Sequence, residues 1–299
     1  MPFIIIAGII AIISLDYSST IIKKEKKKQE PKRIISLSPN VTETLFALGL
    51  GNKVVGRTRF CNYPPEVKKI KEIGGYIDPN YEAIAALHPD IVILLPEHEN
   101  VKSYLEKLNI HYLVVNNKNI SDILMSIKII GDSCNAQNPA KKLIAELRHV
   151  ISFVKAKTEN LKPVRTLISI GRNIGSGTLK NVYIAGKNTY FNELIELAGG
   201  INAFNANSTL DFPLLSAEGI IHLNPDIIID LIPNLEKTNL TKKILTAEWN
   251  SLGNIDAIKN KRITVLSGDY TVIPGPRFVL LLQDLVKAIH PEINISELN

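Results

Sequence analysis

Short apolar runs alternate along most of the chain with segments in which apolar residues recur at helical spacing. The runs at 33–37, 91–95 and 227–231 show no polar alternation, which is typical of strands buried on both faces of a parallel sheet. Further strands are predicted at 54–56, 111–115, 166–170 and 263–266. The alternation of strands and helices predicts an α/β fold with parallel sheets and flanking helices.

Most of the intervening segments are predicted to be helices that end at glycine or proline. The first begins near Ser38 and Asn40, either of which can cap it, and Gly49 ends it. Glu43 is expected in its first turn, where the helix dipole favours an acid. The other helices are predicted at 81–87, 101–108, 189–198, 217–223 and 278–289.

Residues 120–157 differ from the rest because helical periodicity continues there with few breaking residues. The later part, roughly 139–161, is predicted to be one long helix of about five or six turns, which Pro163 terminates. We therefore expect a first lobe at 34–137, a connecting helix at 138–162 and a second lobe at 163–299.

One segment of the sequence occurs twice. Glu82 stands eight residues before Asp90, and Glu218 stands eight residues before Asp226. In both copies Pro-Asp opens an apolar run, and the copies lie 136 residues apart. This repeat indicates one structural unit used in two similar lobes, with a possible cleft between them and a matching glutamate on each.

Composition narrows the functional classes. The net charge of +6 arises largely from seven of the 35 Lys and Arg residues, which lie between Lys23 and Arg33. The remaining chain has no basic face with interleaved aromatics, so a nucleic-acid-binding function is not supported. Cys61 and Cys134 are too few for a disulfide scaffold, and we expect buried thiols, with pairing of the two in an oxidising compartment as the alternative. No nucleophile elbow or phosphate loop is present, and no enzymatic activity is predicted.

The first 33 residues form a separate segment. Residues 3–15 are apolar apart from Ser14, which fits the apolar part of a secretory signal but is short for a transmembrane helix. A charged linker follows at 23–31. We expect export, with this segment cleaved or kept as a tether; a misassigned start codon is the alternative.

Several motifs together resemble one family. They are Ile35-Ser-Leu-Ser-Pro-Asn-Val-Thr-Glu-Thr-Leu, Asn62-Tyr-Pro-Pro-Glu66, Ile73-Gly-Gly75, the two repeats and Pro274-Gly-Pro-Arg277. From Lys32 onward the chain is similar to ABC-transporter solute-binding proteins of the helical-backbone class, in particular the cobalamin-binding members. The resemblance implies two Rossmann-like lobes, a ligand cleft between them and no enzymatic activity. It also implies an exported, periplasmic or membrane-tethered monomer that delivers a non-covalently bound ligand to a membrane permease and its ATPase.

The resemblance assigns the glutamates of the repeat to transporter docking. Glu82 and Glu218 are then a matched pair read by arginines of the permease, since guanidinium forks bind carboxylates bidentately. The alternative is that each is an ordinary acid in the first turn of a helix.

Five aromatic residues and one arginine are the candidate ligand-binding residues. They follow strands or precede helices, where open α/β sheets bind ligands, and they are Phe60, Tyr76, Tyr183, Phe212, Tyr270 and Arg59. Flat apolar side chains suit the faces and edges of a corrin, so the resemblance implies cobalamin. The chain departs from the family pattern with Leu95 at an expected aromatic position, and its one tryptophan, Trp249, lies elsewhere. For each aromatic the alternative is ordinary loop packing.

Other ligands remain open at this stage. Arg57, Arg59 and Arg172 are candidates for contact with an anionic chelate, such as a ferric siderophore or haem, or are solvated surface residues. A metal-ion receptor would need converging ligands, but the six histidines are scattered. A tetrapyrrole or cluster enzyme would need more cysteine ligands than Cys61 and Cys134.

Overall fold

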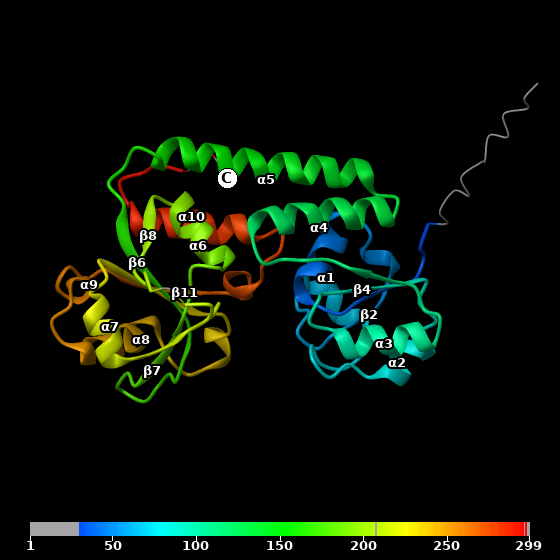
Figure 1. Ribbon diagram of the computed structural model, residues 1–299, viewed down its shortest axis with the longest axis horizontal. Helices are drawn as coiled ribbons and strands as arrows, with labels where there is room; N and C mark the ends of the chain where they lie inside the picture. The colour runs from blue at the N-terminus through cyan, green and yellow to red at the C-terminus, as the bar shows by residue number, and fades with distance from the viewer. Residues whose placement is uncertain (1–29, 207, 296, 298–299) are drawn as a thin grey trace, which may run out of the picture.

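The computed structural model describes residues 30–206, 208–295 and 297, and it shows two lobes side by side beneath one long helix (Figure 1). The predicted leader and linker at 1–33 lie outside the described residues, except for residues 30–33. Within the part of the chain that the structure describes, no helix has the length and apolar character that a membrane crossing requires.

The first lobe contains a five-stranded sheet with the order β3-β2-β1-β4-β5, and all neighbouring strands are parallel. Its elements are β1 (Ile34–Ser36), α1 (Pro39–Ala47), β2 (Val54–Arg57), β3 (Lys71–Glu72), α2 (Tyr81–Ala86), β4 (Ile91–Leu94), α3 (Glu99–Lys107), β5 (Tyr112–Val114) and α4 (Ile120–Ser133). The strands and helices predicted here are confirmed with small shifts at their ends.

This sheet is covered by helices on both faces. Successive residues of a strand point to opposite faces, so both faces need apolar partners. In β4, Ile91 and Ile93 pack with residues of α1 and α4, whereas Val92 and Leu94 pack with residues of α2 and α3. Burial on both faces explains why the run at 91–95 has no polar position.

The second lobe contains a six-stranded sheet with the path β11-β10-β6-β7-β9, and β8 pairs with β6. Its elements are β6 (Val164–Arg172), β7 (Asn181–Ile184), α6 (Tyr190–Leu197), β8 (Gly200–Asn202), β9 (Leu214–Ser216), α7 (Ala217–Leu223), β10 (Ile227–Ile232), α8 (Lys242–Trp249), α9 (Asp256–Lys259), β11 (Ile263–Ser267) and α10 (Phe278–Ile289).

This second sheet is mixed, which corrects the expectation of parallel strands throughout. β7 runs antiparallel to β6, and β9 runs antiparallel to β7. The connection from β6 to β7 is too short for the crossover that a parallel neighbour requires, so the chain turns back as a hairpin. In this lobe β7, β8, β9, α8 and α9 were not predicted from the sequence.

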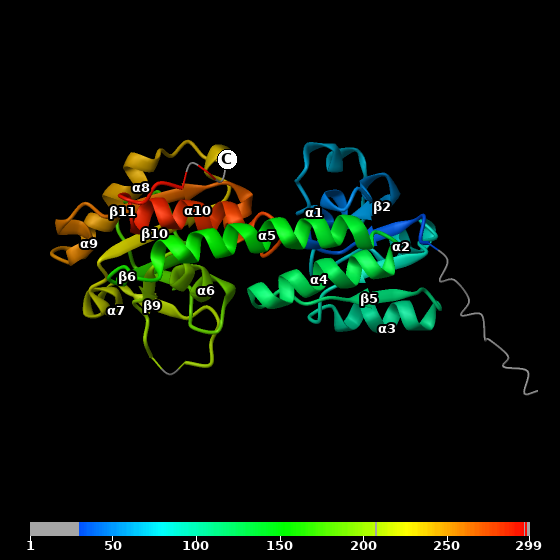
Figure 2. The same cartoon turned by 90° about the horizontal axis from the view of Figure 1, so that it is seen from above.

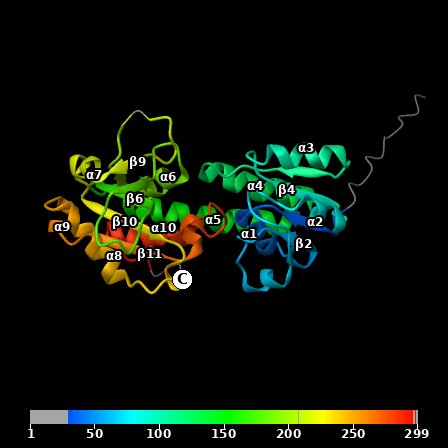
Figure 3. The ribbon, with the colours of Figure 1, turned by 90° about the horizontal axis from the view of Figure 1, so that it is seen from below.

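The connecting helix α5 (Gln137–Thr158) confirms the long helix predicted at 139–161. Its 22 residues span roughly 33 Å, and it crosses both lobes in Figures 1 and 2. Leu147 and Val154 on α5 belong to one core cluster that also takes in α1 and α4 of the first lobe and α6 and α10 of the second. In the view from below, opposite to that of Figure 2, parts of α4 and α5 are visible where the two lobes meet (Figure 3). The lobes are thus joined by a continuous apolar layer.

The Pro-Asp part of the repeat anchors each sheet. Asp90 accepts a hydrogen bond from the backbone N–H of Arg33 at 2.9 Å, where β1 begins, and the Arg33 guanidinium donates to the carbonyl of Leu87, which directly follows α2. In the second lobe Asp226 accepts from the N–H of Arg165 at 2.9 Å, and the Arg165 guanidinium donates to the end of α7. The duplication is therefore structural: each copy connects a helix end to the start of a central strand.

Candidate functional site

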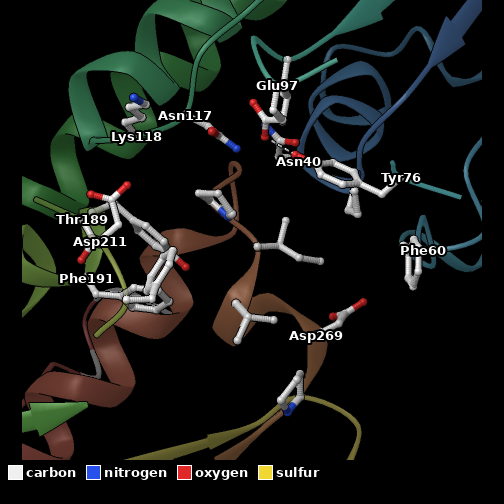
Figure 4. Close-up of a pocket in the computed structure, with 18 of the residues that line it drawn as sticks. Asn40, Phe60, Tyr76, Glu97, Asn117, Lys118, Thr189, Phe191, Asp211 and Asp269 are labelled. Carbon is white, nitrogen blue, oxygen red and sulfur yellow. Dashed lines mark hydrogen bonds between the residues drawn. The ribbon is translucent and has the colours of Figure 1, made fainter. Parts of the chain in front are cut away.

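A cavity of about 700 Å³ lies between the lobes. In the first lobe its lining comes from the segments that follow β1, β2, β3, β4 and β5. In the second lobe it comes from the segments after β10 and β11, from the start of α6 and from the segment before β9. Parallel strands place their carboxyl ends at one edge of a sheet, where such folds bind ligands. Figure 4 shows Asn40, Tyr76 and Glu97 on one side of this space and Thr189, Phe191 and Asp211 on the other.

Three of the predicted aromatic residues line this cavity. They are Phe60, Tyr76 and Phe212. The side chains of Phe60 and Phe212 are 52% and 44% exposed, so each presents apolar surface to a ligand. Leu95 also lines the cavity, where the family pattern led us to expect an aromatic residue.

Contacts with Glu97 and His98 hold Tyr76 in place. Its hydroxyl donates to the Glu97 carboxylate, and its ring lies edge-on to His98 with 4.8 Å between the ring centroids. Burial and the adjacent Glu97 charge raise the pKa of Tyr76, so it stays a neutral donor. His98 lies 2.9 Å from the Tyr76 carbonyl through Nε2 and accepts from the Leu95 N–H through Nδ1 at 3.0 Å. His98 is therefore a structural residue rather than a metal ligand.

The polar lining consists mainly of amides and carboxylates. Among the described residues, the lining includes three carboxylates, of Glu97, Asp211 and Asp269, and one cation, Lys118. The amide side chains are those of Asn40, Asn62, Asn116, Asn117, Asn188 and Asn234. The sequence analysis did not single out this polar set. Their positions could have identified them, because most of these residues follow a strand that the alternation of strands and helices had already predicted.

Tyr190 is a further lining residue that the sequence analysis did not identify. It begins α6, is 5% exposed and packs on Phe191 with 4.2 Å between ring centroids. Its hydroxyl has no hydrogen-bond partner among the described residues. Burial, with the nearby charge of Glu43, raises its pKa well above the ordinary value. The hydroxyl oxygen is itself buried, so Tyr190 lines the cavity with its other atoms and does not offer this donor to a ligand.

Three of the predicted ligand-binding residues lie outside the lining that the described residues define. Tyr183 is on β7, where Val182 and Ile184 point into the core, so Tyr183 points to the opposite face. Tyr270 donates to Asp284 at 2.6 Å and packs against the core. Arg59 lies 3.2 Å from Asp78 on the surface.

Two other arginines are buried rather than placed in the cleft or in solvent. The Arg57 guanidinium donates to the carbonyls of Val67 and Thr58. The Arg172 side chain is fully buried between Asp230 and Glu248 in the second lobe. Neither is available to an anionic ligand, which corrects the expectation for both.

Glu82 and Glu218 occupy matching exposed positions. Each lies in the first turn of its helix, α2 or α7, and the N-caps Asn80 and Ser216 satisfy the backbone there. Hydrogen bonds from its own backbone N–H and from Ser216 lower the pKa of Glu218. Both helices lie on the side of the molecule away from α5 (Figure 1).

No group of His, Cys, Asp and Glu side chains suited to holding a metal ion occurs among the described residues. Cys61 and Cys134 are both buried and are not joined to each other. Cys61 accepts from the Thr42 hydroxyl at 3.1 Å within the first lobe.

Comparison with known proteins identifies the family of this fold and site. The model of the family described as "Periplasmic binding protein" matches residues 34–270. The uncharacterized ABC transporter substrate-binding lipoprotein YvrC of Bacillus subtilis (strain 168) is 30% identical over 275 residues, which cover 89% of this chain and 82% of that protein. The vitamin B12-binding protein of Vibrio parahaemolyticus is 27% identical over 251 residues, covering 82% of this chain and 85% of that protein.

Solved structures agree on the fold. The periplasmic heme-binding protein RhuT from Roseiflexus sp. RS-1, in its apo form, superposes with a TM-score of 0.74 at 26% identity. The match covers 87% of this chain and 98% of that chain. The two-lobe arrangement predicted from the sequence is thus confirmed by the structure and by this comparison.

Proposed function

Because this chain belongs to the periplasmic binding protein family, the non-enzymatic substrate-binding components of ABC transporters, we propose that it captures a corrinoid in the interlobe cavity. In this proposal the ligand is cobalamin, and the protein delivers it to a membrane permease that works with an ATPase. Phe60, Tyr76 and Phe212 cover the corrin, and the polar lining contacts its periphery. The proposed contacts do not extend to Tyr183, Tyr270 or Arg59.

The charge of the cavity lining is the observation that favours a corrinoid over an anionic chelate. Haem brings propionates and many ferric siderophores carry carboxylates, whereas the described lining holds the carboxylates of Glu97 and Asp211, and that of Asp269 paired with Arg277, against one lysine. An anionic chelate would meet repulsion there. A corrinoid has a periphery rich in amides, and each asparagine side chain offers both a donor and an acceptor to them. Amide-rich lining therefore favours the corrinoid.

The described lining residues are also poorly suited to coordinate the iron of haem. Haem iron takes His, Cys, Met or Tyr as its axial protein ligand. Among the described lining residues the candidates are Tyr76 and Tyr190. The hydroxyl of Tyr76 is engaged by Glu97, and burial raises the pKa of both tyrosines, which opposes the phenolate that binds iron.

The experiment that tests the function is a calorimetric titration of the purified protein with three ligands. We expect cyanocobalamin to bind with a Kd below about 1 μM. Hemin and a ferric siderophore are expected to bind at least about tenfold more weakly, because their negative charge meets that of the lining. Failure of all three to bind below micromolar Kd, or tighter binding of hemin, would contradict the proposal.

Two aromatic residues of the second lobe provide a matched control for this titration. Phe212 and Tyr183 are 44% and 50% exposed, but only Phe212 lines the cavity. Phe212→Ala should weaken cyanocobalamin binding about tenfold or more, as for a buried aromatic anchor, whereas Tyr183→Ala should leave it unchanged. Equal losses in both variants would place the ligand elsewhere.

The hydroxyl of Tyr190 gives a second prediction. Tyr190→Phe should leave the ligand-free protein as stable as before, because the hydroxyl makes no hydrogen bond within the part of the chain that the structure describes. The same variant should bind cyanocobalamin as tightly as the parent protein, because the buried hydroxyl is not accessible from the cavity. Urea unfolding and calorimetry measure the two effects. A stability loss above about 1 kcal/mol would show that the hydroxyl is already bonded in the free protein.

Docking and location complete the proposed function. We propose that Glu82 and Glu218 contact arginines of the permease, one on each lobe. Their exposure and their matched places on α2 and α7 support this role. We further propose that the protein is exported and acts as a monomer at the outer face of the cytoplasmic membrane. The family description and the lipoprotein named in Bacillus subtilis support that location.

A further inference from the structure

One side chain reaches from the second lobe into the first. Arg277 lies immediately before α10, and its Nε donates to Glu43 Oε2 of α1 at 2.9 Å while its Nη2 donates to Glu43 Oε1. The two residues are 234 positions apart in the chain. The Arg277 side chain is 14% exposed and that of Glu43 is 3% exposed, so the bidentate pair is shielded from water. Glu43 therefore joins the lobes, and it is not the first-turn helix acid that its sequence position suggested.

The same guanidinium contacts two more segments of the cavity wall. Its Nη1 lies 3.0 Å from Asp269 Oδ1, and Asp269 lines the cavity. Its Cζ lies 3.8 Å from the ring centroid of Tyr63. Tyr63 belongs to the first-lobe loop that also carries Phe60 and Asn62 into the cavity. Arg277 thus connects three wall segments: Asp269, the loop with Tyr63, and α1, whose first residues are Pro39 and Asn40.

The surroundings of the pair make it a narrow junction between the lobes. The ligand cavity is lined by Asn40 and Asp269, which neighbour the pair, and a second cavity of about 490 Å³ is lined by the pair itself together with residues of α5. Tyr63 and apolar residues of α10 also line this second cavity. Close to the pair, a Cβ on Gly275 would come within 3.2 Å of the Asn40 backbone. The lobes therefore approach closely at the pair, next to both cavities.

The energetics indicate a geometric role for this contact. Removing two charges from water costs about as much as their attraction returns, so a buried ion pair adds little net stability compared with an apolar pair. Burial raises the pKa of Glu43, against the two hydrogen bonds from Arg277, which reflects that cost. What a bidentate fork does provide is a fixed distance and orientation between its partners.

We propose that Arg277 and Glu43 are positioning residues that set the separation of the lobes and hence the width of the ligand cavity. Through its contacts with Asp269 and Tyr63, Arg277 also positions the two segments of the cavity wall to which these residues belong. A second contact near the cavity, from the Ile120 N–H to the Glu193 carboxylate at 2.8 Å, joins the lobes at α4 and α6. With the pair lost, the lobes pivot about this contact and α5. The effect on affinity rests on the proposed function, but the effect on lobe spacing does not.

The test measures lobe spacing without ligand. Spin labels at Lys107→Cys and Lys243→Cys, exposed positions on α3 and α8, report the interlobe distance by pulsed electron resonance. The parent protein should give a narrow distribution. Arg277→Met should give a broader, shifted one, and the affinity for cyanocobalamin should fall about tenfold. A folded variant with the parent distribution overturns the proposal.

Three further variants keep the result decisive. The double variant Glu43→Leu with Arg277→Met leaves no unpaired buried charge, so it tests the spacing even where Arg277→Met fails to fold. Glu193→Gln weakens the other interlobe contact, and it should broaden the distribution further when added to the double variant. Lys128→Met removes an ion pair within the first lobe and should leave both spacing and affinity unchanged. If the parent protein binds none of the three ligands, the proposed function fails while the distance measurement still decides the role of the pair.

Discussion

Arg172→Met is expected to reduce the free energy of unfolding by about 3–5 kcal/mol. Arg172 donates to Asp230 at 2.8 Å and also to Glu248, and all three side chains are buried. Asp230 also accepts from the Trp249 indole at 3.0 Å. The variant would leave two buried carboxylates without their cation, and the penalty for an uncompensated buried charge is large. The network joins the end of β6 to β10 and α8, so the whole second lobe should lose stability.

Urea unfolding followed by circular dichroism measures this effect, and the fluorescence of Trp249, the one tryptophan of the chain, reports on the network directly. The surface pair Lys128 and Asp132 supplies the control, because its side chains are 61% and 47% exposed. Lys128→Met should change stability by less than about 0.5 kcal/mol. A similarly small effect of Arg172→Met would show that the two carboxylates find other partners or water.

Joint reversal of charge, Glu82→Lys with Glu218→Lys, is expected to abolish ligand uptake by cells. If each carboxylate is bound by a permease arginine, the reversal replaces two attractive contacts with two repulsive ones. Affinity for the ligand should remain unchanged, because neither residue lines the cavity. The fold should tolerate the change, since the loss of a favourable acid at a helix start costs only about 0.3–1 kcal/mol.

The control for this experiment carries the same change of net charge on another surface. Glu146 and Glu159 are exposed residues on and just after α5, and α5 itself lies on the side of the molecule opposite α2 and α7 (Figure 1). Glu146→Lys with Glu159→Lys should leave uptake intact. Reduced uptake in the control would indicate a general effect of charge, and reduced ligand affinity in the test variant would refute the separation of docking from binding.

Elements whose ends are marked by local sequence patterns were well predicted. The helices at 217–223 and 278–289 have the predicted bounds. In each, apolar residues recur at helical spacing, and a proline follows within two residues of the last turn. β7 and β9 were missed because each is short and pairs antiparallel at one side of the sheet. Whether such a segment becomes a strand depends on the neighbour it meets, which the sequence does not display.

The candidate site shows the same division. Phe60, Tyr76 and Phe212 line the cavity as their positions beside strands suggested, whereas Tyr183 does not. Tyr183 falls on a four-residue strand, and a shift of one residue in such a strand reverses which side chains face the core. Arg172 falls just beyond the strand predicted at 166–170, but β6 extends to include it, and its side chain turns into the second lobe.

The sequence by itself determined the class of the protein: two α/β lobes, a long connecting helix and a repeat that places one glutamate on each lobe. These features rest on contacts between residues near in the chain or on periodic apolar spacing, which a sequence displays directly. Only the tertiary structure decided the composition of the cavity wall and the role of Glu43. Its partner Arg277 lies 234 residues away, and a pairing over that separation is set by how the two lobes pack, not by any local pattern.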